Sequence, residues 1–197
     1  MASRSGVPER IRTSDLLLRR QSLYPAELPG HLGLTTRYDL ITGMAKQILL
    51  IAHVPSNNTQ RLRDAVLEGA RSDDVDGVDV ATFTPFEANA EDVLRADALI
   101  LGTTENLGYM SGALKDFFDR IYYPCLEQTQ GLPYALYVRA GHDGTGTCRA
   151  VASITTGLRW RALADPLVCR GEWQESFVGE CRELGLTVAA GVEAGIF

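Results

Sequence analysis

Three polar segments of this 197-residue chain carry the residue types that could hold a small ligand. They cover residues 53–59, 102–112 and 141–146, and each follows a short apolar run typical of a buried β-strand. The carboxyl ends of parallel strands meet at one edge of a sheet, which is where ligands bind in open α/β folds. We therefore expect the three segments to form one binding site.

The first segment places uncharged hydrogen-bond donors at the start of a predicted helix, in the run Ser56-Asn57-Asn58-Thr59. Backbone N–H groups at a helix N-terminus bind anions, and hydroxyl and amide groups add donors. The segment lacks the lysine of a triphosphate-binding loop, and the chain lacks G-x-G-x-x-G, which disfavours a dinucleotide. A phosphate monoester is the ligand that remains. The simpler alternative is that Asn58 or Thr59 only caps the helix.

The third segment is rich in glycine. Gly141, Gly144 and Gly146 permit positive φ angles and a close approach of the backbone to a flat ligand. His142 lies among them and either faces such a ligand or stands in solvent.

The second segment and the helix predicted after it contain a fixed pattern of small, hydroxyl and charged residues. Its members are Gly102, Thr103, Gly108, Met110, Ser111 and Gly112, followed by Lys115-Asp116-Phe117-Phe118-Asp119-Arg120. This pattern resembles the flavodoxin family, and more closely its branch of flavodoxin-like NAD(P)H:quinone and FMN reductases. The similarity covers roughly residues 46–170. Thr104 replaces the proline that is usual in the family, and Val54 replaces a hydroxyl residue in the first segment.

The resemblance implies an FMN cofactor, with its phosphate on Ser56, Asn57, Asn58 and Thr59. The isoalloxazine ring would lie between the second and third segments. Its contacts would come from Thr104, Glu105, Asn106, Leu107, Gly108 and Tyr109 in the second segment and from Gly141, His142 and Gly144 in the third. Tyr109 is the best candidate to stack on the ring, and Glu105 either faces the ring or points to solvent.

This resemblance also sets the functional expectation. A flavin supplies the redox chemistry itself, so no catalytic nucleophile is needed and none is identified. We expect an NAD(P)H-dependent oxidoreductase that passes electrons through FMN to a quinone-like or other small acceptor. The alternatives are an electron carrier that docks to a redox protein, and a flavin-binding module without turnover. A homo-oligomer is left open.

Apolar runs and helical patterns alternate around the three segments. Strands are predicted at 47–52, 78–83, 98–102, 132–139 and 166–170. Helices are predicted at 59–69, 91–96, 112–123, 147–158 and 175–184, the last extending as far as 194 if its glycines are tolerated. This alternation predicts a doubly wound α/β domain with a five-stranded, mainly parallel sheet, and the resemblance makes it flavodoxin-like.

The composition is ordinary for a soluble protein, with 45% hydrophobic and 22% charged residues. A formal net charge of −6 disfavours nucleic acid as a partner, and no stretch is apolar enough to span a membrane. The four cysteines form no C-x-x-C pair and have no histidine at metal-ligand spacing. We expect reduced thiols in a cytoplasmic protein without a metal site.

The first 43 residues differ in character from the rest, with six arginines, four acidic residues and no lysine. The run 9–18 resembles the false translation that appears when a reading frame is extended upstream through the antisense strand of a transfer-RNA gene. We expect the working domain to span residues 44–197, with Met44 as the true start; the alternative is a genuine tail that is disordered. Residues 44–197 hold 13 basic and 21 acidic residues, a formal net charge of −8.

Overall fold

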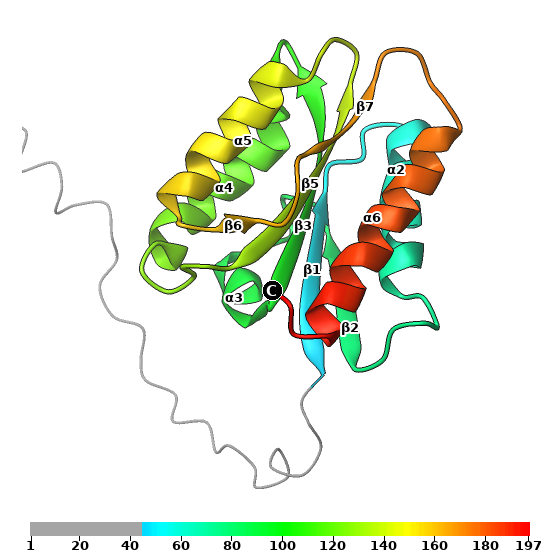
Figure 1. Ribbon diagram of the computed structural model, residues 1–197. Coiled ribbons are helices and arrows are strands. Elements are labelled where there is room, and N and C mark those ends of the chain that lie inside the picture. The colour runs from blue at the N-terminus through cyan, green and yellow to red at the C-terminus, as the bar shows by residue number, and fades with distance from the viewer. Residues whose placement is uncertain (1–44) are drawn as a thin grey trace, which may run out of the picture. The chain divides into compact units, whose positions relative to one another are not determined.

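The computed structural model describes residues 45–197, so the expectations about residues 1–43 lie outside the described part (Figure 1). The strands are β1 (Lys46–Ala52), β2 (Val78–Phe83), β3 (Ala98–Asn106), β4 (Tyr109–Met110), β5 (Pro133–Ala140), β6 (Arg161–Ala162) and β7 (Leu167–Arg170). The helices are α2 (Asn57–Ala70), α3 (Ala90–Arg95), α4 (Gly112–Cys125), α5 (Thr145–Gly157) and α6 (Ser176–Glu193). Within this part of the chain, no helix is long and apolar enough to cross a membrane.

The strands form one sheet in the order β2-β1-β3-β5, and β6 and β7 both pair with β5 to fill the fifth position. All these pairings are parallel, and only the short β4 runs antiparallel, against β3. The predicted doubly wound sheet with five parallel positions is therefore confirmed. The Leu163 N–H still donates to Tyr134 of β5, but residues 164–166 leave the ladder, and Pro166 has no N–H to donate to it, so the fifth position is split. The two-residue β6 was not predicted.

Helices cover both faces of the sheet, with α2 and α6 on one face and α3, α4 and α5 on the other (Figure 1). Side chains of a strand alternate between faces, so Ile48 and Leu50 pack under α2 and α6, whereas Leu49 and Ile51 pack under the other three helices. All four are at most 3% exposed. This two-sided burial explains why β1 has a continuous apolar sequence.

Glycines bring α2 and α6 into direct backbone contact. A Cβ added to Gly69 would lie 1.9 Å from the carbonyl oxygen of Arg182, and one added to Gly185 would lie 2.0 Å from that of Val66. Gly185 therefore serves packing and does not end the helix, and α6 runs on to Glu193. Exposed ion pairs such as Arg182–Glu68 flank the contact and contribute little by comparison.

This helix contact predicts opposite effects for two glycine substitutions in α6. Gly185→Ala forces backbone atoms apart and should lower the free energy of unfolding by about 2 kcal/mol or more. Gly179→Ala adds a methyl group where nothing lies within 4 Å, and should raise it by about 0.5–1 kcal/mol through helix propensity. Urea denaturation measures both, and equal midpoints for Gly185→Ala and the parent would contradict the close packing.

Candidate functional site

The three polar segments lie side by side because they follow neighbouring parallel strands. β1 pairs with β3 and β3 with β5, so that Ala52 lies opposite Gly102 and Gly102 opposite Tyr137. The backbone N–H of His53 also donates to the carbonyl oxygen of Gly102, over 2.9 Å. The first, second and third loops, named here in chain order after these strands, therefore begin at one edge of the sheet.

The first loop ends in a closed helix cap. Ser56 is the N-cap of α2, and its hydroxyl oxygen accepts from the backbone N–H of Thr59 at 3.3 Å. The Thr59 hydroxyl oxygen accepts in turn from the Ser56 N–H at 3.0 Å, and this hydroxyl donates to the Ser56 carbonyl oxygen at 2.8 Å. The capping role expected of Asn58 or Thr59 thus belongs to Ser56, because the pair one turn apart forms a reciprocal capping box.

This cap leaves uncharged donors at the head of α2. Asn57 and Asn58 are exposed, and their backbone N–H groups fall in the first turn, where no helical acceptor exists. Burial lowers the pKa of His53 below its ordinary value, so its imidazole is uncharged at neutral pH. The loop can therefore bind an anion with N–H and amide groups and the helix dipole, without a cation.

The second loop is a tight hairpin. β3 runs on to Asn106, Leu107 and Gly108 form the turn, and β4 returns with Tyr109 opposite Asn106. Leu107 and Gly108 both have positive φ, 54° and 74°, which is the pattern of a type I′ hairpin turn. The strand was predicted to end at Gly102; the polar sequence beyond that residue concealed its continuation.

Buried hydroxyl groups fix the base of this hairpin. The Thr103 hydroxyl donates to that of Ser111 at 3.0 Å, and the Ser111 N–H donates to the Thr103 hydroxyl oxygen at 3.2 Å. Ser111 also caps α4. Thr104 is buried and donates to the side-chain oxygen of Asn106, whereas Tyr109 is 43% exposed at the surface.

The third loop is bound to the second through a carboxylate. Glu105 accepts from the backbone N–H of His142 at 2.8 Å and from that of Gly144 at 3.2 Å. The sequence left Glu105 facing either the ring or solvent; its carboxylate turns to the third loop, and Glu105 also lines the cavity between the two loops. Gly144 adopts φ 72° at the N-cap of α5, and a Cβ there would lie 2.8 Å from a Val168 methyl group, so this position requires glycine.

A cavity of about 460 Å³ opens between the second and third loops. Its lining residues are Glu105, Leu107, Gly108, Gly141, His142, Asp143 and Gly146. The volume lies within the range of small-molecule and cofactor sites. Five of the predicted ring contacts line it, together with Asp143 and Gly146, which belong to the same predicted third segment. Thr104, Asn106, Tyr109 and Gly144 lie beside it, and residues 56–59 lie at the neighbouring loop.

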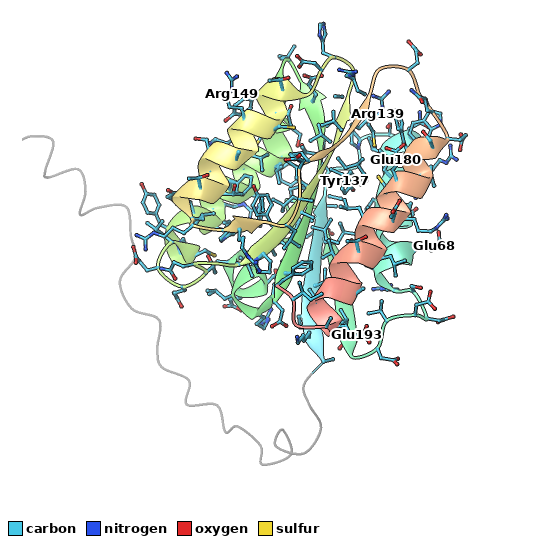
Figure 2. The ribbon with its side chains drawn as sticks, viewed as in Figure 1. Glu68, Tyr137, Arg139, Arg149, Glu180 and Glu193 are labelled. Carbon is cyan, nitrogen blue, oxygen red and sulfur yellow. The ribbon has the colours of Figure 1, made fainter. Side chains whose placement is uncertain are left out.

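Other polar and sulfur-containing side chains serve the scaffold. Arg139 donates to the carbonyl oxygens of Cys169 and Gly171, and so joins β5 to β7. Tyr137 lies in the core on the α2–α6 face (Figure 2). All four cysteines are free thiols, and only Cys148 is partly exposed.

Known proteins resemble this chain in sequence and in fold. No family model matches the chain. A flavodoxin from Aquifex aeolicus (strain VF5) is 34% identical over 112 residues, which are 57% of this chain and 60% of that protein. The flavodoxin of an archaeon superposes with a TM-score of 0.63 at 20% identity, covering 74% of this chain and 98% of that one.

A second solved structure, a flavodoxin, WrbA-like protein from Agrobacterium tumefaciens, superposes with a TM-score of 0.60 at 16% identity. It covers 77% of this chain and 98% of that one. The chain described here thus has the α/β fold of the flavodoxins, with its candidate site at the loops after β1, β3 and β5.

The close contact between Gly146 and the Gly108 carbonyl, which joins the third loop to the second, gives a testable prediction. A Cβ on Gly146 would lie 1.9 Å from the Gly108 carbonyl oxygen, so Gly146→Ala must push α5 away from the hairpin. We expect the free energy of unfolding to fall by about 1–3 kcal/mol. Gly112→Ala, at the first turn of α4 with nothing within 4 Å, is the matched control and should be nearly neutral. Thermal unfolding of both variants tests this, and an unaffected Gly146→Ala would show that the loops do not touch.

Proposed function

We propose that this chain is a member of the flavodoxin family that binds FMN across its three loops. The observation that carries the proposal is the pairing of uncharged donors at the start of α2, at Asn57 and Asn58, with a cavity between two glycine-containing loops. Support comes from the Aquifex aeolicus relative, which bears the name flavodoxin. FMN would supply the electron-transfer chemistry, and the protein would supply binding and electrostatics.

The residues present fit the two ends of FMN. The N–H and amide groups of Asn57 and Asn58 face outward at the head of α2 and suit a phosphate. The cavity walls are largely backbone at Gly108, Gly141 and Gly146, which admits a flat ring system. Ser56 holds the first turn in place through its cap, so its part in phosphate binding is both to donate and to orient.

The phosphate assignment can be tested with two helix caps. Ser56→Ala and Asn89→Ala each remove a capping box, from α2 and α3 respectively, and each should cost about 1 kcal/mol of stability. Only Ser56→Ala should weaken FMN, by about tenfold, while leaving riboflavin nearly unchanged because riboflavin has no phosphate. Fluorescence titration of both ligands measures this. Equal losses for FMN and riboflavin would remove the phosphate from the first loop.

Within this family the charge at the cavity favours an electron carrier. The cavity lining contains the carboxylates of Glu105 and Asp143 and no lysine or arginine. Such a surface suits a basic protein partner and repels the phosphates of a nicotinamide dinucleotide. Leu107, fully exposed at the tip of the hairpin, adds an apolar contact beside the cavity. The formal charge of −8 for residues 44–197 has the same sign.

The second candidate is the NAD(P)H-dependent oxidoreductase expected from the sequence. It is favoured by the pattern of Gly108, Met110, Ser111 and Gly112, in which Met110 and Ser111 are buried and fix the hairpin to α4. A small quinone or similar acceptor would then bind in the cavity, which in an electron carrier would face a protein partner.

Rapid mixing separates the two candidates. For a carrier, we expect the absorption of the FMN-loaded protein to persist for minutes with NADPH or NADH. A flavoprotein reductase should bleach it at a rate that falls as salt is added, because screening weakens steering by an acidic surface. Bleaching by either nicotinamide, followed by recovery when a quinone is added, would establish the oxidoreductase instead. Absence of flavin absorption after loading would reject both.

A further inference from the structure

Glu105 occupies an unusual position for a carboxylate. It is half-buried at the end of β3, and its two oxygens accept from two N–H groups of a loop 37 and 39 residues further along the chain. Among the described residues, no lysine, arginine or histidine side chain forms an ion pair with it. The partners of this charge are backbone groups only.

The third loop is shaped to receive that carboxylate. Gly144 is left-handed, and its N–H and that of His142, two residues earlier, converge on one anion. Concave arrangements of this kind bind anions through N–H groups of successive residues. Hydrogen bonds to an ionised acceptor are stronger than neutral ones, so the contact is well suited to fix a loop that has no regular structure.

The hairpin and the third loop are held together from two sides. On one side, Gly146 allows α5 to touch the Gly108 carbonyl. On the other, Glu105 reaches across to His142 and Gly144, and all of these except Gly144 line the cavity. Neither the hairpin nor the third loop pairs with the main sheet beyond the strand ends, so these contacts set the distance across the cavity.

We infer that Glu105 is the positioning residue of the ligand site: its carboxylate binds the third loop to the hairpin before any ligand enters and sets the width of the cavity. The contact of Glu105 with the third loop exists without a ligand, whereas its effect on flavin binding rests on the proposed function. Because Glu105 acts at the ring end of the site, its loss should weaken FMN and riboflavin by the same factor. This pattern differs from that expected for Ser56→Ala.

The first test uses the full-length protein without ligand. Glu105→Gln should raise the hydrogen-exchange rates of the His142 and Gly144 amides by about tenfold or more, measured by NMR. Glu87→Gln is the matched control, because Glu87 accepts from the Thr84 N–H at 2.9 Å near α3, and it should affect Thr84 alone. Unchanged exchange at His142 and Gly144 would overturn the inference whether or not the protein binds flavin.

The second test adds the ligands and a conservative variant. Glu105→Gln and Glu105→Asp should both weaken FMN and riboflavin by about tenfold, because aspartate keeps the charge but is one methylene too short to span both N–H groups. Full rescue by aspartate would show that charge and not reach matters, and would overturn the positioning role. Tighter binding in Glu105→Gln would also overturn it, since the carboxylate would then be competing with the ligand.

Discussion

The structure depends on one row of backbone pairing across β1, β3 and β5. Ala52, Gly102 and Tyr137 lie opposite one another in this row, at the level where the strands give way to loops. Gly102 has no side chain there, and a Cβ would lie 2.2 Å from the phenol group of Tyr137. The pairing therefore fixes the register of the three strands, and Gly102 leaves space for the buried side chain of Tyr137. The three loops of the candidate site begin one or a few residues beyond this row.

Strand order and helix placement could be predicted from sequence because burial leaves a pattern in neighbouring residues. The run Ile48-Leu49-Leu50-Ile51 is apolar throughout because both faces of β1 are covered, and Val80 is the only buried residue of the edge strand β2. Gly185 was harder to interpret. A glycine that ends a helix and one that lets another helix approach look the same in a sequence, and only the position of Val66 distinguishes them.

The site was predictable as a set of loops but not as a set of contacts. Residues 56–59 were identified as a helix start, yet the choice of Ser56 over Asn58 as the cap depends on a reciprocal bond with Thr59. The bond from Glu105 to the third loop joins residues far apart in the chain, and no local pattern encodes it. Asp143 lies in the turn before α5, where its carboxylate accepts from the Thr145 N–H, and the residue also lines the cavity.

The tip of the hairpin carries two energetic penalties at one residue. Leu107 holds a left-handed backbone, which costs a residue other than glycine about 1 kcal/mol, and its side chain is wholly in water, where an apolar group is least favoured. Glycine or asparagine would make the same turn at lower cost. The core gains nothing from this leucine, so the isolated domain would fold at least as well without it. Contact with another surface would remove the solvation penalty and leave only the backbone strain.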